Sequence, residues 1–170
     1  YLETKEQYKD CILFYRLGDF YEMFFDDAIC AHKELELTLT GKSCGLKERA
    51  PMCGVPFHSA ETYINRLVER GYKVAICEQV EDPKLAKGLV KREVTRIVTP
   101  GTNCFTGSLD ETRNNYLMGI VSVDHSFGIS IVDVTTGEYM LTEVESVSKL
   151  LDEVNKFMPA ELICNDSFYI

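Results

Sequence analysis

Short apolar runs, each closed by glycine, proline or polar residues, recur along the first hundred residues. Runs of this length, alternating or continuously apolar, are typical of strands. The segments expected to be strands are residues 11–17, 20–25, 37–40, 73–80 and 90–99. Residues 20–25 could equally open the helix expected over 28–35. Apolar residues at helical spacing predict another helix after Ser59, ended by Gly71.

Residues 51–58 contain two prolines and a glycine and follow a polar stretch over 42–50. Because proline cannot donate a backbone hydrogen bond, it is rare in the middle of a sheet. We therefore expect residues 51–58 to form a structured loop and not a central strand.

The second half of the chain has the pattern of an antiparallel meander. Apolar runs cover residues 116–123, 128–134 and 138–144, with short polar turns between them. Residues 147–158 carry apolar side chains at helical spacing, and residues 161–164 begin another strand. Three antiparallel strands, a helix and a strand are how ribonuclease-H-like folds begin, and a unit that stops there is incomplete.

The amino-acid composition indicates a boundary between the first hundred residues and the second half of the chain. Residues 102–115 are rich in Asn, Thr, Ser and Gly, which is the composition of a linker. We expect a first domain over residues 1–101, a linker over 102–115 and a partial second domain over 116–170. The fold class is α/β, with a mixed sheet in the first domain.

The formal net charge of −9 argues against contact with nucleic acid when the chain is taken as a whole. The charge is uneven, because residues 1–100 carry −1 and residues 101–170 carry −8. The first part also has a local basic run, made of Lys84, Lys87, Lys91, Arg92 and Arg96. We expect Arg92 and Arg96 to share one face of their strand and to be able to contact phosphates. A solvated surface is the equally favoured alternative for this run.

An aromatic residue and an acid two positions apart stand out within residues 18–25, which hold four aromatics and two carboxylates. Residues two apart in a strand point to the same face, so Phe20 and Glu22 would emerge together. The simpler interpretation is that Phe20 belongs to the core and Glu22 is a surface acid. This interpretation would place a charged side chain on the same strand face as a core residue, which is unfavourable. The pattern favours a ligand-contacting pair without deciding the question.

A phosphate-binding loop is suggested by Gly41, Lys42 and Ser43, but the pattern fails. That motif needs a glycine five positions before its second glycine, and Glu36 stands there. We therefore reject ATP binding by this segment.

Three acids of the second half could belong to a two-metal nuclease built on a ribonuclease-H-like sheet. They are Asp124, Asp133 and Glu138. We favour a simpler interpretation, with Asp124 in a turn and the other two as solvated acids at strand ends. A metal-dependent nuclease stays an alternative.

The seven cysteines are odd in number, widely spaced and without a CxxC pair. Buried apolar residues in a reducing cytosol explain them better than disulfides or zinc, and we expect no metal site and no catalytic residue. No stretch approaches the ~20 apolar residues of a membrane helix, and the polar first residues argue against a signal peptide. The chain begins with Tyr1 in place of Met, so we expect a piece of a longer protein.

Four segments together resemble the MutS family of DNA mismatch-recognition proteins. They are residues 16–28, with the Phe-x-Glu pattern at Phe20 and Glu22, and residues 51–58, 74–79 and 94–102. They occur in the family's order and at nearly its spacing, and a weaker likeness continues beyond them. The resemblance implies a mismatch-recognition domain followed by the first part of a ribonuclease-H-like connector domain, without the lever, clamp and ATPase domains.

By this resemblance, Phe20 is the wedge that enters the minor groove and stacks on a mispaired base. Glu22 is the acid that hydrogen-bonds to that base. Further candidates for contacts with the DNA backbone or groove are Lys42, Met52, Arg92 and Arg96.

The resemblance also implies partners. They are double-stranded DNA with mismatches or small loops, and a MutL-type protein docking on the connector domain, where the −8 charge suits protein better than DNA. The full-length protein is expected to be a homodimer that binds ATP and Mg²⁺ and hydrolyses ATP in the bacterial cytoplasm, associated with the nucleoid when it acts. The chain itself is expected to need no cofactor and to be no enzyme. A protein-docking module is a further alternative.

Overall fold

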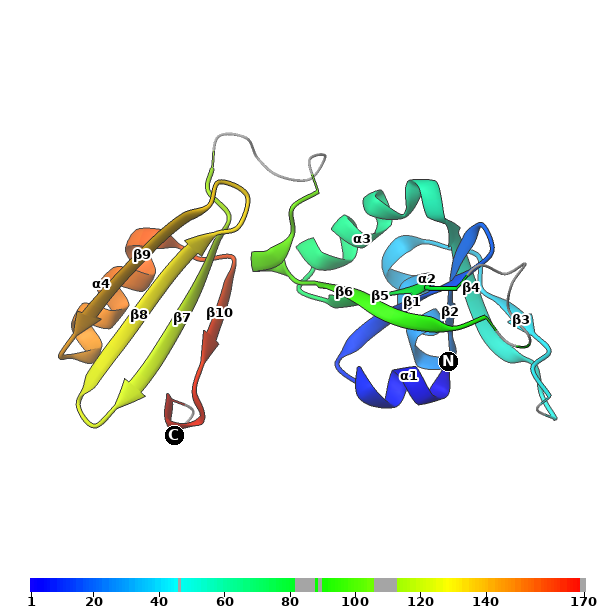
Figure 1. The fold of residues 1–170 in the computed structure, drawn as a ribbon, viewed down its shortest axis with the longest axis horizontal. Coiled ribbons are helices and arrows are strands. Elements are labelled where there is room, and N and C mark those ends of the chain that lie inside the picture. Colours follow the sequence, from blue (N-terminus) through cyan, green and yellow to red (C-terminus); the bar gives the residue numbers. More distant parts are fainter. Residues whose placement is uncertain (46, 82–87, 89, 106–112, 169–170) are drawn as a thin grey trace. The chain divides into compact units, whose positions relative to one another are not determined.

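The computed structural model describes the chain except for residues 46, 82–87, 89, 106–112 and 169–170 (Figure 1). The chain forms two compact units, Tyr1–Thr99 and Pro100–Ile170. Lys84 and Lys87 of the basic run lie outside the described residues, as does part of the expected linker.

The first unit is built on a six-stranded mixed sheet. Its strands are β1 (Cys11–Leu17), β2 (Phe20–Phe24), β3 (Thr40–Lys42), β4 (Ala50–Pro56), β5 (Lys73–Gln79) and β6 (Arg92–Val98). They lie in the order β3-β4-β2-β1-β5-β6, and β1 pairs with β5 in parallel. Both strands of this central pair are buried on both faces, which explains their continuous apolar runs.

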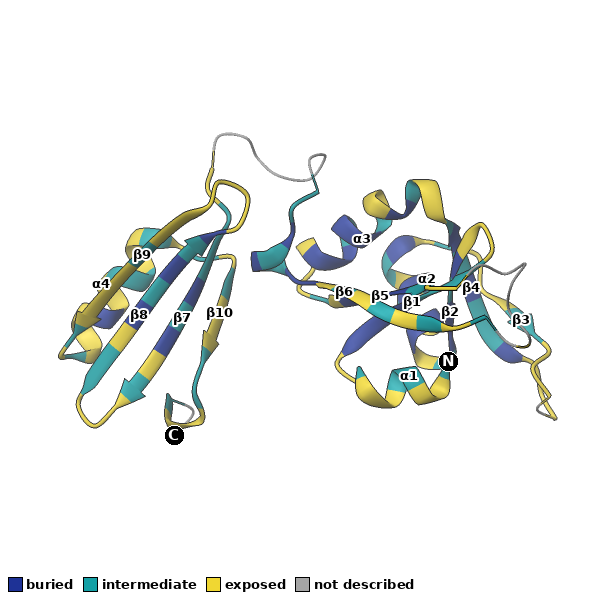
Figure 2. Ribbon diagram, in the orientation of Figure 1, coloured by how far each residue is buried: buried dark blue, intermediate teal, exposed yellow. Residues whose placement is uncertain are grey.

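Helices cover both faces of this sheet (Figure 2). They are α1 (Leu2–Gln7), α2 (Phe25–Leu35) and α3 (Ala60–Glu69), with a 3₁₀ turn, η1 (Phe57–Ser59), before α3. On one face α2 lies against β4, where the Cys53 thiol is 3.5 Å from the Ala28 carbonyl oxygen. On the other face Tyr1 and Tyr8, at the ends of α1, pack on a small cluster that includes Leu13. This second face stays partly open along β2 and β4.

The expectation of a loop over residues 51–58 is wrong, because Ala50–Pro56 forms β4 inside the sheet. Its two prolines sit where β4 has a neighbour on one side. Pro51 pairs with β3 and Pro56 with β2, and Met52 alone is paired on both sides. A missing N–H is tolerated where one side of a strand is free.

The strand expected over residues 37–40 is also misplaced, since β3 covers Thr40–Lys42. Helix α2 ends with Glu36 in a left-handed conformation, at φ 59°. The His32 ring then bonds the Leu37 carbonyl oxygen. With this carbonyl engaged by the helix, the chain joins the sheet only at Thr40, opposite Met52.

Strand β6 contains a bulge that the sequence pattern did not indicate. Val94 pairs with Cys77, but Arg96 pairs with Ile76, so Thr95 is the extra residue. Because Cys77 and Ile76 are consecutive, their partners lie on opposite faces. The expectation that Arg92 and Arg96 share a face is therefore wrong.

The second unit is a four-stranded sheet with one helix. Its elements are β7 (Tyr116–Val123), β8 (Ser126–Asp133), β9 (Glu138–Val144), α4 (Val147–Phe157) and β10 (Glu161–Cys164), with 3₁₀ turns η2 (Pro100–Thr102) and η3 (Asp166–Phe168). The order is β10-β7-β8-β9, with β10 parallel to β7 and the other pairs antiparallel. Leu150 of α4 packs on Met118, Ile120, Ile129 and Ile131. The expected meander, helix and strand are confirmed, as is the mixed α/β class.

Candidate nucleic-acid interface

The β1–β2 hairpin holds Phe20 at the surface. Gly18 takes a positive φ of 61° in the turn, a conformation that glycine adopts without a steric penalty. Phe20 follows it as the first residue of β2 and is 47% exposed, while Tyr21 and Met23 on the opposite face are buried. Glu22 shares the face of Phe20, as the spacing predicted. A large exposed aromatic ring beside an acid on a stiff hairpin is suited to contact with a ligand.

The open face of the sheet collects most of the predicted site residues. Glu22 pairs with Gly54 and Phe24 with Met52 in the β2–β4 ladder, so Met52 lies on the face of Phe20. Met52 in turn pairs with Thr40, which places Lys42, two residues on, on this face as well.

The β5–β6 ladder separates the two arginines. Tyr15 pairs with both Glu22 and Cys77, so Cys77 and Gln79 belong to the open face, and Arg92 pairs with Gln79. Arg96 is on the opposite face because of the bulge. Five of the six candidates thus share one face, and Arg96 does not.

Glu22 and Lys42 form an ion pair, which the sequence did not indicate. The Glu22 side chain is 16% exposed and that of Lys42 is 41% exposed. Lys42 Nζ also lies 5.6 Å from the ring centroid of Phe24. Lys42 was expected to contact the DNA backbone, yet in this structure its partner is the acid of the Phe-x-Glu pattern.

The Arg92 guanidinium is held by the protein itself. Its Nε donates to the Arg16 carbonyl oxygen at 2.7 Å and its Nη1 to that of Val90 at 2.8 Å. It also lies over the ring of Tyr15, 5.3 Å from the centroid. These contacts fix β6 against β1 and leave a positive charge on the open face.

Behind the hairpin lies a cluster that sequence reasoning missed. The Arg16 guanidinium stacks on the ring of Phe57, 3.8 Å from its centroid, and reaches Glu78 at 3.6 Å. The Tyr21 hydroxyl donates a hydrogen bond to the Glu78 carboxylate. Burial, with Glu78 beside it, raises the pKa of Tyr21 to about 12, so this hydroxyl keeps its proton. Contacts of this kind depend on sheet register and leave no local pattern.

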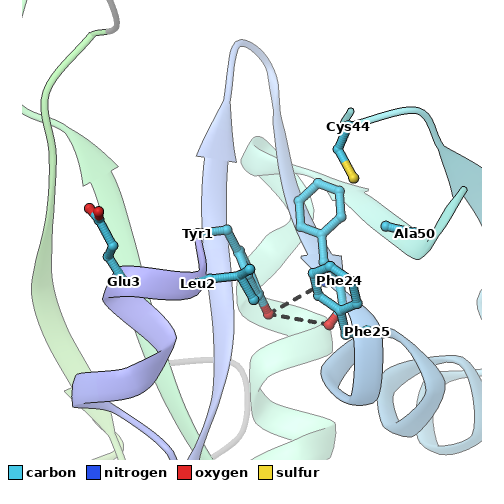
Figure 3. Close-up of a pocket in the computed structure, with 7 residues that line it drawn as sticks. All are labelled: Tyr1, Leu2, Glu3, Phe24, Phe25, Cys44 and Ala50. Atoms are coloured by element: carbon cyan, nitrogen blue, oxygen red, sulfur yellow. Dashed lines mark hydrogen bonds between the residues drawn. The ribbon is translucent and has the colours of Figure 1, made fainter. Parts of the chain in front are cut away.

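A cavity of about 360 Å³ opens beside the interface, at the junction of β2 and α2 (Figure 3). Its lining is mostly apolar and consists of Tyr1, Leu2, Glu3, Phe24, Phe25, Cys44 and Ala50. Beneath it the buried carboxylate of Asp27 accepts hydrogen bonds from the Tyr1 hydroxyl at 2.6 Å, Lys5 Nζ at 2.8 Å and the Leu13 amide at 3.1 Å. Burial and Asp27 raise the pKa of Tyr1. This network anchors α1 to the sheet.

The cysteines have no partner sulfur, and all seven are free thiols. Burial raises the pKa of Cys53 and of Cys77 to about 11, so both remain protonated at neutral pH. Among the described residues, no group of three His, Cys, Asp or Glu side chains is placed to hold a metal ion.

The three acids of the second unit do not form one cluster, because Asp133 and Glu138 are cross-strand partners at one end of β8 and Asp124 lies at the other end. Asp124 is exposed in the β7–β8 turn, at φ 53°, and Glu138 bonds Asn114 and the Tyr116 hydroxyl. Asp133 is fully buried, so the expectation of a solvated acid is wrong for it. Its carboxylate caps the β8–β9 turn.

The open face thus carries an exposed aromatic ring, an acid and cations on one sheet, an arrangement suited to contact with a ligand. Comparison with models of protein families identifies the family of the chain. Residues 1–105 match the model of MutS domain I, and residues 115–169 match that of MutS domain II. The chain belongs to the MutS family.

Curated relatives named DNA mismatch repair protein MutS match nearly the whole chain. The relative from Lachnoclostridium phytofermentans is 71% identical, that from Acetivibrio thermocellus 63% and that from Ruminiclostridium cellulolyticum 61%. The matches cover 99%, 99% and 98% of this chain but 18%, 20% and 19% of the relatives. The chain thus spans about a fifth of their length. In the described part of the chain, no helix is long and apolar enough to cross a membrane.

Proposed function

We propose that the first unit recognises mispaired or unpaired bases in double-stranded DNA, with Phe20 as an aromatic wedge and Glu22 as the acid that tests the base. The observation that carries the proposal is the exposed Phe20 ring on the same open face as Glu22. Membership of the MutS family supports the same function. The function we propose is binding and not catalysis.

The wedge works through a balance of stacking energies. Inserting an apolar side chain between base pairs costs a few kcal/mol of base stacking. Stacking of a base on an aromatic ring returns ~1–3 kcal/mol. A mismatch is already poorly stacked and easier to kink, so this balance favours Phe20 insertion at a mismatch over insertion at a normal pair.

Glu22 adds discrimination through its charge. A carboxylate near phosphates is repelled unless a base offers it a proton. A mispaired or unpaired base can offer a donor from its pairing edge, whereas in a normal pair the donors of the pairing edges bond the partner base. Glu22 therefore penalises normal duplex more than it penalises mismatched duplex.

The wedge role of Phe20 is tested by fluorescence anisotropy with the full-length protein that carries this chain, on G·T and matched duplexes of equal length. Phe20→Ala is expected to remove the preference for the mismatch, a loss of about 5- to 150-fold if stacking is worth ~1–3 kcal/mol. Phe57→Ala is the matched control, because Phe57 is also an exposed aromatic but stacks on Arg16. A preference that survives Phe20→Ala would refute the wedge.

The role of Glu22 is tested in the same titration. Glu22→Ala is expected to tighten binding to matched DNA, since a repulsive charge is removed. Weaker binding to both duplexes would show that Glu22 does not discriminate in this way.

For the full-length protein we propose the properties that the family resemblance implies. These are a homodimer, a MutL-type partner docked on the second unit, and ATP and Mg²⁺ bound by a domain beyond this chain. A cytoplasmic location also remains a prediction.

A further inference from the structure

We propose that Lys42 determines specificity by acting on Glu22. In this proposal the ion pair between them stays closed on normal DNA and opens when Glu22 meets a mispaired base. The proposal rests on the proposed function and adds a residue that controls it.

The pair is built across three strands. Glu22 lies on β2 and Lys42 on β3, and β4 runs between them. The residue of β4 opposite Glu22 is Gly54. A Cβ atom there would lie 3.5 Å from Glu22 Cγ and 3.2 Å from the Tyr21 carbonyl oxygen. The glycine therefore leaves open the space over β4 through which the two charged groups meet.

Lys42 is the outer partner of the pair. Its side chain is 41% exposed against 16% for Glu22, and the nearby Phe24 ring adds a cation–π contact that favours the inward position of the ammonium group. A base that approaches Glu22 from solvent must displace Lys42 or pass beside it.

The closed pair and the open pair present different charges to DNA. When closed, the pair offsets part of the Glu22 charge, so phosphates near Phe20 are repelled less than by an unpaired carboxylate. When a base takes the carboxylate, the Lys42 ammonium is released close to the phosphates that flank the base. Lys42 thus exchanges the Glu22 carboxylate for a DNA phosphate as its partner. The exchange occurs only where the base supplies a hydrogen-bond donor to Glu22.

This exchange predicts an asymmetric effect of removing Lys42. On matched DNA, loss of Lys42 leaves an uncompensated carboxylate against the phosphates, and binding weakens. On mismatched DNA, loss of Lys42 removes a contact with a phosphate, which weakens binding. It also removes the cost of opening the ion pair with Glu22, and the two effects offset each other. The preference for the mismatch should therefore increase.

The test is a double-mutant cycle in the full-length protein, with Lys42→Met and Glu22→Gln, measured by anisotropy on G·T and matched duplexes. Lys42→Met alone should raise the matched-to-mismatched ratio of Kd by about two- to five-fold, which is the size of a partly exposed ion pair. In the Glu22→Gln background the same change should leave this ratio unaltered. Lys42→Arg keeps the cation and should behave like the parent.

Lys47→Met is the matched control, because it removes the same charge five residues further along without a contact to Glu22. It should be additive with Glu22→Gln. Thermal unfolding of each variant verifies the fold.

Three results would overturn the proposal: equal loss on both duplexes in both backgrounds, no effect of Lys42→Met, or the same coupling for Lys47→Met. The first of these would assign Lys42 to a plain phosphate contact. The Phe20→Ala titration separates this proposal from the proposed function, since it depends on neither Lys42 nor Glu22.

Discussion

Asp133 offers a stability prediction that can be worked out from its contacts. It ends β8 with no exposed surface. One carboxylate oxygen accepts hydrogen bonds from the Thr135 amide at 2.8 Å, the Thr135 hydroxyl at 2.6 Å and the Thr136 amide at 3.4 Å. The other accepts from the Asn115 amide at 3.1 Å. Both oxygens are therefore needed as acceptors.

Asp133→Asn keeps one of these acceptors and replaces the other with a donor. The new NH₂ group would then face the Asn115 amide, and a buried donor without a partner costs about 1–3 kcal/mol. The remaining bonds also lose the assistance of a charge, which adds roughly 1 kcal/mol. We expect the free energy of unfolding of the second unit to fall by about 2–4 kcal/mol.

The loss should depend on pH. Burial alone would raise the pKa of Asp133, but hydrogen bonds from Thr135, Asn115 and Thr136 outweigh it and lower the pKa. A group with a lowered folded pKa stabilises the fold above its unfolded pKa, about 3.9, and loses that contribution as the pH falls below it. The difference between parent and Asp133→Asn should therefore be full at pH 7 and shrink below about pH 4.

The assay is urea unfolding followed by circular dichroism, because the chain has no tryptophan to serve as a fluorescent probe. Hydrogen exchange of peptides from β7 and β8 reports on the second unit separately. Asp124→Asn is the matched control: Asp124 is exposed at φ 53°, a conformation that asparagine tolerates, so its effect should stay within about 0.5 kcal/mol. Equal effects of the two substitutions would refute the capping role. A stabilising effect of Asp133→Asn would instead favour a functional carboxylate.

Three further substitutions test the first unit. Arg92→Glu should weaken binding to matched and mismatched DNA alike and reduce the salt slope by about 1; a loss confined to mismatched DNA in the anisotropy titration would contradict a backbone role. Gly54→Val should displace Glu22, because its Cβ atom would already touch Glu22 Cγ at 3.5 Å and its two methyl groups need further space, and so lower the preference for a mismatch; an unchanged preference would count against that geometry. Tyr21→Phe removes the hydrogen bond to Glu78 and should lower the urea midpoint through a loss of about 1 kcal/mol, so an unaltered midpoint would disprove its contribution.

Elements governed by local pattern were predicted well from the sequence. The apolar run of β1, and those of β7, β8 and β9 with short polar turns between them, identify strands by themselves. The two-residue repeat of a strand correctly placed Phe20 and Glu22 on one face. These features depend on neighbours one or two residues away, which a sequence displays directly.

Features that depend on strand pairing were not predictable in this way. Pro51 and Pro56 are tolerated in β4 because of where β3 and β2 end, and the bulge at Thr95 appears only in the pairing of β6 with β5. Likewise the ion pair of Glu22 with Lys42 joins residues 20 positions apart across a third strand. Sheet register decides these contacts, and register is a property of the whole sheet.

Photocrosslinking tests the central claim, that Phe20 stacks on the mispaired base, most directly. The full-length protein is bound to a duplex with 5-iodouracil opposite guanine, irradiated and digested, and the crosslinked peptide is sequenced. Stacked aromatic rings react with this base, so the crosslink should map to Phe20 and should be absent when 5-iodouracil is paired with adenine. A crosslink that maps to Phe57, or one of equal yield on the matched duplex, would contradict the account.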